Sequence, residues 1–195
     1  MAAQSLDLLS PGDEVPTFEL DDPTGRTVAL EDFRDHEAVL VVFTCNHCPY
    51  AKAKHPELNA IAAEYDEVAV VGINANDPEE YPDDSPDEMR TRMESGEIDF
   101  DAYLFDESQS VAAAYGATCT PDPFLCVNDG NTFRLAYHGR VDDAHDPETE
   151  PNRLELREAI DAVLAGDDVP FDPQPSRGCS IKWKPGNEPD YWDEL

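Results

Sequence analysis

The sequence predicts an α/β fold in which a central mixed β-sheet is flanked by helices. Two apolar runs of strand length, residues 38–43 and 68–73, are separated by a helix-forming segment over 49–65. Two strands joined by a helix form a parallel unit, and continuous apolar runs are typical of strands that are covered on both faces. Further along, an Asn-Asp-Gly-Asn sequence at 128–131 lies between two apolar runs and predicts an antiparallel hairpin. Parallel and antiparallel pairs together require a mixed sheet.

The elements before the first parallel unit, and its helix, follow from local turn and helix rules. Residues 16–20 and 26–30 flank an Asp-Pro-Thr-Gly turn, which predicts an N-terminal β-hairpin. The helix over 49–65 contains Pro56, which we expect to kink or restart it, because proline removes one backbone hydrogen bond and clashes with the preceding turn.

The later elements are bounded by helix caps and by glycines. Ser85 followed by proline predicts a helix start, and a glycine after residue 95 predicts its end. The remaining predictions, in chain order, are a loop over 74–84, a helix over 86–95, a strand over 103–105, a helix over 108–115, strands over 124–127 and 132–138, and a helix over 152–164.

The proline-rich end of the chain is predicted to be an extension of a single domain. We place the domain at residues 10–168 and the extension at 169–195. The segment over 176–183 contains Ile181 and Trp183, whose apolar area stabilises the protein by roughly 25 cal/mol per Å² when it is buried. The extension is therefore expected to pack on the domain, either beside the functional site or over a distant groove.

Charge is the strongest compositional signal. The 195 residues include 44 acidic and 13 basic ones, a formal net charge of −31. Disorder is excluded because apolar residues gather in blocks such as AVLVVF and VAVVGI. Carboxylates spread through the whole chain are typical of a halophilic surface, whose self-repulsion is screened by high salt. Nothing resembles a basic face, so we expect no nucleic-acid partner.

The sequence also bears on compartment. No apolar run approaches the roughly 20 residues needed to span a bilayer, so no membrane association is expected. The first residues lack the basic and apolar segments of a secretory signal, which predicts a cytoplasmic protein. Five irregularly spaced cysteines do not form a secreted disulfide framework. In a reducing compartment a close cysteine pair is usually catalytic or metal-binding.

The chemistry of the chain is concentrated in Cys45-Asn46-His47-Cys48, which lies between the first apolar run and its helix. Two cysteines with two residues between them can close a reversible disulfide, and a helix N-terminus stabilises a thiolate. A protonated His47 beside that terminus would also stabilise the Cys45 thiolate. The pattern predicts a thiol–disulfide oxidoreductase.

The order of the predicted elements is the thioredoxin-like arrangement, and four segments carry a closer resemblance: PGDEVPTFEL, VVFTCNHCP, YGATCTPDPFL and the terminal GCSIKW. They resemble the redoxin branch of the thioredoxin superfamily, related to alkyl hydroperoxide reductase and thiol-specific antioxidant proteins. Within it they resemble a peroxiredoxin-like subgroup with a dithiol motif, and the acidic composition favours a haloarchaeal member.

The resemblance implies roles for particular residues. Cys45 would be the nucleophile at the mouth of the site and Cys48 the more buried resolving thiol. Thr120-Pro121 would form a cis-proline turn facing the dithiol. The backbone of Thr120 would then be an edge with which an extended substrate can pair. The implied substrates are disulfide-bearing proteins or small thiols and peroxides, with no cofactor, and the oligomeric state stays open.

The main alternative function is a thiol peroxidase. Peroxidases of this superfamily place a threonine three residues before the peroxidatic cysteine and a proline four residues before that threonine. Aligning the peroxidatic cysteine with Cys48 places Cys45 at the threonine and Val41 at the proline. The hydroxyl that polarises the peroxide is then absent, which favours disulfide exchange over peroxide reduction.

The other cysteines leave further alternatives open. Cys119 and Cys179 are candidate auxiliary thiols, although each can equally be a packing residue, and Cys126 is expected to be buried filler. A less favoured function is a metal-binding protein or metallochaperone that uses Cys45 and Cys48. Zinc usually takes a second close pair, which Cys119 and Cys126 do not provide. The acidic run over 142–146 matches no known cation-binding loop, so no metal is expected.

Overall fold

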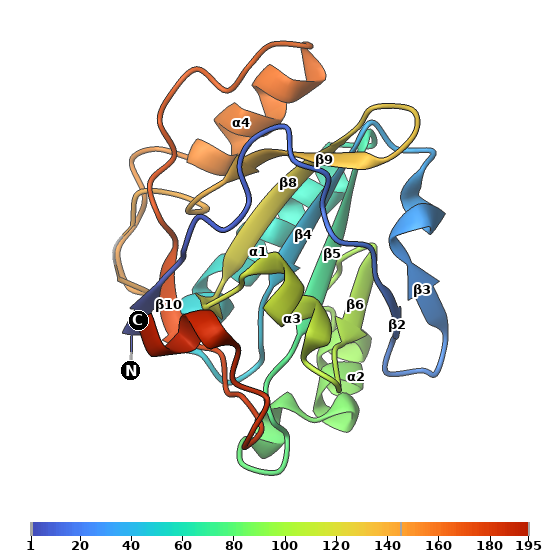
Figure 1. The fold of residues 1–195 in the computed structure, drawn as a ribbon, viewed down its shortest axis with the longest axis vertical. Coiled ribbons are helices and arrows are strands. Elements are labelled where there is room, and N and C mark those ends of the chain that lie inside the picture. The colour runs from blue at the N-terminus through green and yellow to red at the C-terminus, as the bar shows by residue number, and fades with distance from the viewer. Residues whose placement is uncertain (1, 145, 195) are drawn as a thin grey trace.

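The computed structural model describes residues 2–144 and 146–194 and is built around a twisted sheet with helices on both faces (Figure 1). The strands are β1 (Ala2–Gln4), β2 (Glu19–Asp21), β3 (Thr27–Ala29), β4 (Ala38–Phe43), β5 (Val68–Asn74), β6 (Ala102–Phe105), β7 (Cys119–Thr120), β8 (Asp122–Asn128), β9 (Phe133–His138) and β10 (Arg177–Ser180). The α-helices are α1 (Pro49–Glu64), α2 (Pro86–Ser95), α3 (Ser110–Tyr115) and α4 (Glu155–Leu164). Short 3₁₀ turns are η1 (Leu30–Phe33), η2 (Pro82–Asp84) and η3 (Asp190–Glu194).

The main sheet has seven strands in the order β3-β2-β6-β5-β4-β8-β9. Strand β4 pairs in parallel with β5 and antiparallel with β8, so the predicted mixed sheet is confirmed. All six residues of β4 are buried, as the continuous apolar run predicted. The carboxyl end of this central strand leads directly into the Cys45–Cys48 segment.

The two faces of the sheet are covered by different elements. Side chains alternate between faces along a strand, and β4 shows this alternation clearly. Val39, Val41 and Phe43 pack in one apolar cluster with residues of α3, whereas Leu40 and Val42 pack in another with residues of α1 and α4. Helix α1, which follows the dithiol, thus packs on one face of the sheet together with α4.

Local start and stop signals predicted α2 correctly. Ser85 Oγ accepts the backbone N–H of Glu88, and Gly96 ends the helix with a left-handed φ of 74°. Helix α4 begins at Glu155 rather than at residue 152. Helix α1 runs unbroken through Pro56, so the restart predicted there is not observed.

A second sheet, which the sequence did not predict, joins the two ends of the chain. Its three strands have the order β1-β10-β7 and are antiparallel. The expected packing of the C-terminal segment is observed, because Ile181 and Trp183 are only 2% and 7% exposed and belong to the main apolar cluster. Figure 1 shows β10 beside the dark blue strand β1 near the start of the chain.

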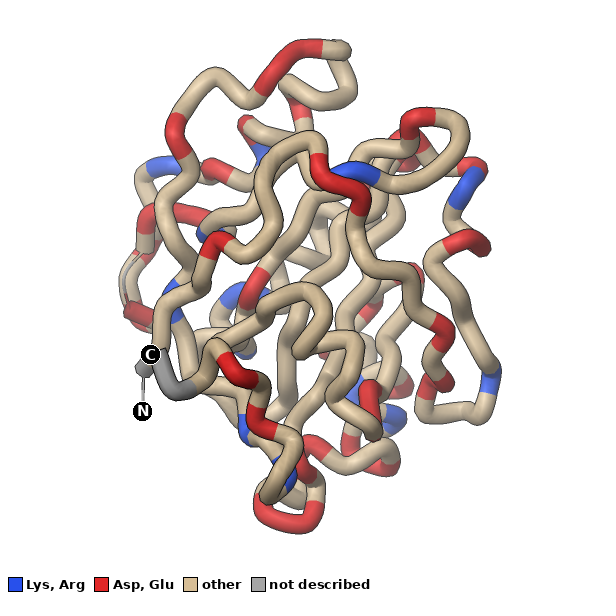
Figure 2. Tube along the Cα trace, in the orientation of Figure 1, with Lys and Arg blue, Asp and Glu red and all other residues tan. Residues whose placement is uncertain are grey.

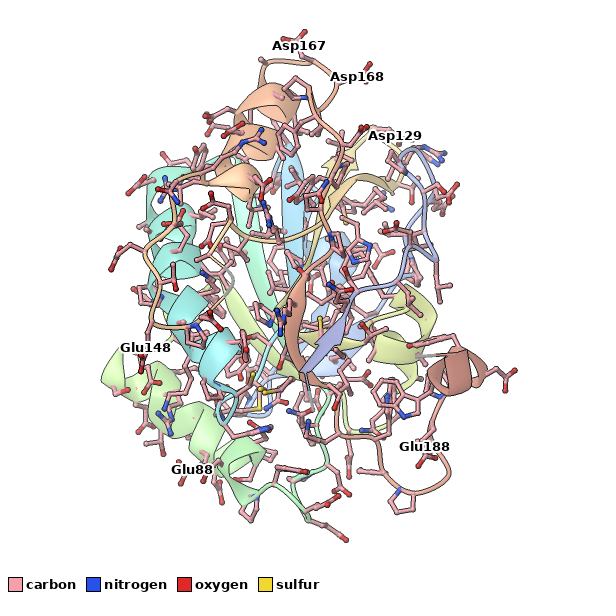
Figure 3. The ribbon with its side chains drawn as sticks, turned by 90° about the vertical axis from the view of Figure 1, so that its left-hand side faces the viewer. Glu88, Asp129, Glu148, Asp167, Asp168 and Glu188 are labelled. Atoms are coloured by element: carbon pink, nitrogen blue, oxygen red, sulfur yellow. The ribbon has the colours of Figure 1, made fainter. Side chains whose placement is uncertain are left out.

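Acidic side chains occupy the whole periphery of the molecule. Figure 2 shows Asp and Glu along nearly every loop and outer turn, with few Lys and Arg between them. The carboxylates labelled in Figure 3, among them Glu88, Asp129 and Glu148, project outward from the body of the protein. A solvated acidic surface of this kind is compatible with the predicted halophilic character, which stays a prediction. No described helix is long and apolar enough to cross a membrane.

Candidate active site

Cys45 and Cys48 lie in the segment that connects the central strand β4 to α1. Cys48 is the N-cap residue of α1, with extended backbone angles (φ −71°, ψ 124°), and Pro49 is the first helical residue. All five cysteines are free thiols. Both side chains of the dithiol are fully buried. The expected position of Cys45 at the open mouth of the site is therefore not found.

Thr120 faces the dithiol, as the sequence predicted. Its hydroxyl Oγ1 lies 3.2 Å from Cys45 Sγ, and its carbonyl oxygen lies 3.4 Å from Cys48 Sγ. The peptide bond between Thr120 and Pro121 is cis, as expected. One residue of β7 thus contacts both sulfurs of the pair.

The edge of β7 is covered by the end of the chain itself. Cys179 of β10 lies opposite Thr120, and Ser180 lies opposite Cys119. The pairing is continued by a hydrogen bond from the Ile181 N–H to the Thr118 carbonyl, at 3.0 Å. The backbone edge that was expected to receive an extended substrate is therefore occupied by β10.

Cys179 completes a group of three sulfurs, Cys45, Cys48 and Cys179, which we call the three-sulfur cluster. Cys179 packs against the buried pair and Ala51, and it is the partly exposed member of the group. Cys119, the other candidate auxiliary thiol, lies outside this cluster. Its thiol donates a hydrogen bond to the Pro121 carbonyl, with an Sγ to O distance of 3.8 Å. Cys126 is fully buried in β8, as expected of a packing residue.

The groups around the dithiol favour a thiolate at Cys48 over one at Cys45. The pKa of Cys48 is lowered to about 4, because hydrogen bonds to its sulfur outweigh the effect of burial. The largest contribution comes from the Cys45 thiol, followed by the Cys179 side chain and the backbone N–H groups of Ala51 and Cys179. The Ala51 N–H is an unpaired donor in the first turn of α1, so the thiolate caps the helix. Burial, together with the hydrogen bond to Cys48 and the charge of Asp84, raises the pKa of Cys45 well above its ordinary value.

The dithiol segment is held by one buried carboxylate. Asp84 Oδ1 accepts the backbone N–H groups of Asn46 (2.7 Å) and His47 (3.2 Å). Its Oδ2 accepts Asn76 Nδ2 (2.7 Å) and the His47 ring at Nδ1. These four hydrogen bonds, His47 and Asn76 foremost, outweigh burial and hold the pKa of Asp84 below its usual range. Asn46 is held further by the Tyr103 hydroxyl at 3.0 Å.

His47 is oriented by Asp84 and by an aromatic ring. Its imidazole stacks on Tyr81, with ring centroids 4.8 Å apart, and its side chain is 19% exposed. The ring that was expected to stabilise Cys45 is thus hydrogen-bonded to the Asp84 carboxylate. The structure brings His47 into the site as a residue that positions the loop.

The geometry also bears on the metal-binding alternative. Ligand atoms of Cys45, His47 and Asp84 lie within 4.8 Å of one another. However, a carboxylate has about four acceptor positions, and Asp84 uses all of them on N–H donors. In the acidic run, Asp142 binds Lys54 at 2.7 Å, and His145 lies outside the described residues. The group around Asp84 is fully accounted for as a hydrogen-bonded support of the loop.

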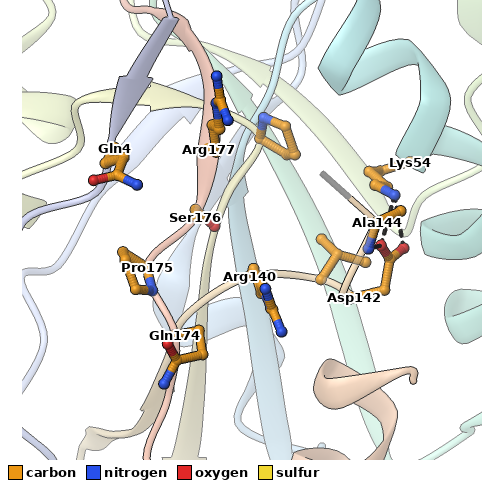
Figure 4. A pocket seen from close by; sticks show the side chains of 11 residues that line it. Gln4, Lys54, Arg140, Asp142, Ala144, Gln174, Pro175, Ser176 and Arg177 are labelled. Carbon is orange, nitrogen blue, oxygen red and sulfur yellow. Dashed lines mark hydrogen bonds and ion pairs between the residues drawn. The ribbon is translucent and has the colours of Figure 1, made fainter. Parts of the chain in front are cut away.

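A pocket of about 240 Å³ has Pro121 in its lining (Figure 4). Lys54, Arg140 and Arg177 line it, which is unusual in so acidic a chain. Two of these cations are paired, Lys54 with Asp142 and Arg140 with Glu155. The described lining contains no cysteine. Pro121 is therefore the one candidate site residue in the described lining of this pocket.

The sequence indicated the dithiol, Thr120, Pro121 and Cys179, but it gave no indication of Asp84. That residue lies in an acidic stretch, Tyr-Pro-Asp-Asp-Ser, where it looks like any other surface carboxylate. Its neighbour Asp83 is exposed, whereas Asp84 is fully buried. Nothing in the local pattern separates the two, since Asn46 and His47, which supply three of the four donors to Asp84, lie 38 and 37 residues away in the chain.

Comparison with known proteins places these features in a family context. The family model described as AhpC/TSA matches residues 11–141. An uncharacterised conserved protein from Geobacillus kaustophilus is 41% identical, with a TM-score of 0.87, and the match covers 95% of this chain and 98% of that one. A hypothetical protein from Sinorhizobium meliloti is 39% identical, with a TM-score of 0.87 and coverage of 94% and 99%.

More distant structures show the fold alone. A candidate thiol:disulfide interchange protein from Chlorobium tepidum is 24% identical, with a TM-score of 0.60, and the match covers 80% of this chain and 99% of that one. The predicted thioredoxin-like fold is thereby confirmed. No curated protein matches the chain.

Proposed function

The chain belongs to the AhpC/TSA family, and we propose that it is a thiol–disulfide oxidoreductase that uses a reversible Cys45–Cys48 disulfide. The observation that carries the proposal is the hydrogen-bonded pair itself. Cys48 caps α1 as a stabilised thiolate, and the Cys45 thiol donates to it. Adjacent sulfurs in the thiolate and thiol forms are the reactants that disulfide exchange requires.

The proposed reaction begins with the Cys48 thiolate. It attacks one sulfur of a substrate disulfide, a Cys48–substrate bond forms, and the other substrate sulfur leaves as a thiolate. Cys45 then gives up its proton to that thiolate and attacks Cys48 Sγ. The Cys45–Cys48 bond forms, the second substrate thiolate is released, and two electrons have passed from the dithiol to the substrate.

This assignment reverses the roles expected from the family resemblance, in which Cys45 attacks. The reversal rests on the groups around the two sulfurs. Hydrogen bonds from Cys45, Cys179 and the Ala51 N–H in the first turn of α1 lower the pKa of Cys48, whereas burial and the charge of Asp84 raise the pKa of Cys45.

Thr120, Pro121 and His47 support the reaction in this proposal. The Thr120 hydroxyl, 3.2 Å from Cys45 Sγ, lowers the pKa of that thiol and so favours its ionisation in the resolving step. Pro121 follows Thr120 in the turn that presents this hydroxyl. His47 acts as a positioning residue, because its ring and backbone both bind the carboxylate that holds the dithiol segment.

Trapping of mixed disulfides tests the function and the roles together. Removing both thiols that lie beside Cys48 in the three-sulfur cluster leaves the first intermediate without an exit, so Cys45→Ser/Cys179→Ser should accumulate mixed disulfides with disulfide-bearing proteins or glutathione. Cys48→Ser should accumulate none, and Cys126→Ala, which changes a cysteine remote from the site, should behave as wild type. Trapping by Cys48→Ser alone would show that Cys45 attacks, and an inactive wild type in disulfide reduction would contradict the function.

A thiol peroxidase is the second candidate, and one observation favours it. The stabilised thiolate is Cys48, the residue that aligns with the peroxidatic cysteine. In that reaction Cys48 attacks a peroxide oxygen, the O–O bond breaks and releases water or an alcohol, and Cys48 becomes a sulfenic acid. Cys45 then forms the disulfide and a second water leaves. Measuring peroxide consumption and disulfide reduction side by side on the same preparation decides between the two.

A further inference from the structure

The C-terminal strand β10 occupies the place where a substrate polypeptide would pair. It lies antiparallel to β7, with Cys179 directly opposite Thr120. Thr120 is also the residue that contacts both Cys45 and Cys48. The cysteine of β10 is thereby presented to the dithiol in the way that an extended substrate would present its own.

The close approach of β10 depends on a glycine. A Cβ atom added at Gly178 would lie 1.9 Å from the Thr120 carbonyl oxygen and 2.6 Å from its carbonyl carbon. Backbone atoms of β7 cannot move aside as the end of a flexible side chain can, so a side chain at this position would push the strand away. Gly178 is what lets the next residue, Cys179, reach the three-sulfur cluster.

The same segment is anchored beyond the cluster by specific contacts. The Lys182 N–H donates to Asn76 Oδ1 at 2.8 Å, and its carbonyl accepts the Asp77 N–H and Gln109 Nε2, each at 2.9 Å. Ile181 and Trp183 on either side are buried in the core. Cys179 is therefore held at the dithiol by a fixed strand and not by a loose tail.

Within the three-sulfur cluster, Cys179 contacts Cys48. Its side chain and its backbone N–H both lower the pKa of the Cys48 thiol. Burial and the neighbouring Cys48 raise the pKa of Cys179 to about 11, so it rests as a thiol. Once Cys48 is in a disulfide its negative charge is gone, and the adjacent Lys182 then favours the Cys179 thiolate.

We propose that Cys179 is a third reacting cysteine, and that β10 acts as a built-in substrate strand whose thiol exchanges with the Cys45–Cys48 disulfide to form a Cys48–Cys179 disulfide. This step rests on the proposed function, which supplies the first disulfide. Cys179 gives up its proton and attacks Cys48 Sγ, the Cys45–Cys48 bond breaks, and Cys45 leaves with the electron pair and takes up the proton. The number of disulfides is unchanged, so no further oxidant is needed.

The exchange has a consequence for access to the site. In the Cys48–Cys179 form, β10 is covalently linked to the N-terminus of α1 while it stays paired with β7, and Cys45 is returned to the thiol state. An incoming disulfide-bearing protein then competes with the protein's own strand for the edge of β7. Cys179 also offers a second route for resolving a Cys48–substrate mixed disulfide, in which the substrate thiolate is the leaving group.

Disulfide mapping of the full chain tests the inference directly. Trypsin leaves Cys45 and Cys48 together in the peptide 35–52 and places Cys179 in the peptide 178–182. Protein equilibrated with reduced and oxidised glutathione in molar salt is quenched with acid, alkylated and digested. We expect both an internal disulfide in 35–52 and a link between 35–52 and 178–182. An internal disulfide with no link at any glutathione ratio overturns the inference and leaves the proposed function standing.

Glutathione adducts provide the second measurement. Cys45→Ser treated with oxidised glutathione should lose its Cys48–glutathione adduct as the Cys48–Cys179 disulfide forms, whereas Cys45→Ser/Cys179→Ser should keep the adduct. Equal retention in both variants overturns the inference, and absence of an adduct in the double variant contradicts the proposed attack by Cys48. In the wild-type background, Gly178→Ala should lose most of the 35–52 to 178–182 link and keep the internal disulfide. Cys126→Ala is the matched control and should retain both.

Discussion

Replacing Asp84 by asparagine removes two of the four acceptor positions that hold the dithiol segment. The change keeps the size of the side chain but replaces one oxygen by an NH₂ group. This group lies opposite N–H donors, from which it cannot accept hydrogen bonds. The Asp84 oxygens bind Asn46, His47 and Asn76, and the side chain is fully buried. Each buried donor left unpaired costs about 1–3 kcal/mol. We expect Asp84→Asn to lower the free energy of unfolding by about 2–6 kcal/mol, or by about 1–3 kcal/mol if His47 changes tautomer and pairs with the new amide.

Urea denaturation of the reduced protein in molar salt measures this loss, and the chain offers a close control. Asp83→Asn makes the same chemical change at the adjacent, exposed position, and its carbonyl still accepts Asn46 Nδ2. The control should lie within about 0.5 kcal/mol of wild type. If the two variants lose equal stability, the assignment of Asp84 as the support of the loop is refuted.

The pH dependence of the same difference has a definite sign. The pKa of Asp84 in the folded protein lies below its ordinary value of 3.8, so its stabilising contribution is present above pH 3.8 and is lost as the pH falls through the folded value. The gap between wild type and Asp84→Asn should therefore be constant near neutrality and shrink in acid. A gap that widens as the pH falls contradicts this reasoning.

Three further predictions concern the thiolate, the surface and the tail. In the reduced wild type, the ultraviolet absorbance of one thiolate should persist as the pH falls toward about 4, and this absorbance should be missing in Cys48→Ser. Loss of the absorbance at the ordinary cysteine pKa of about 8.5 contradicts the stabilisation of Cys48. The melting temperature should fall on dilution from molar to millimolar salt, because the Debye length grows from about 3 Å at 1 M to about 30 Å at 0.01 M. The carboxylates that give the net charge of −31 then repel one another with less screening. An unchanged or higher melting temperature contradicts the halophilic prediction. Trp183→Ala should cost about 3–5 kcal/mol of unfolding free energy, and more than Trp192→Ala, whose ring is less buried; equal losses would show that the tail contributes little to the core.

The sequence by itself determined the order of the main elements and the place of the chemistry. Strands β4 and β5 are continuous apolar runs, and α2 has a serine cap and a terminal glycine, so local rules suffice to predict them. The Cys45–Cys48 pair at a strand-to-helix junction was equally visible, because its spacing and its position are both properties of a few consecutive residues. The division of the chain into a domain over 10–168 and an extension stays a prediction.

Only the tertiary structure decided which groups surround each sulfur of the dithiol and what covers the site. Strands β7 and β10 have two and four residues, too few for a periodic signal, and each exists through its pairing with a strand far away in the chain. Asp84 is buried because donors from other segments surround it, and its charge disfavours a thiolate at Cys45. The lowered pKa of Cys48 comes from Cys45, from Cys179, more than a hundred residues away, and from Ala51, three residues away. A thiol pKa sums the burial, charges and donors around one sulfur atom, and these are set by the packed fold and not by the neighbouring residues in the sequence.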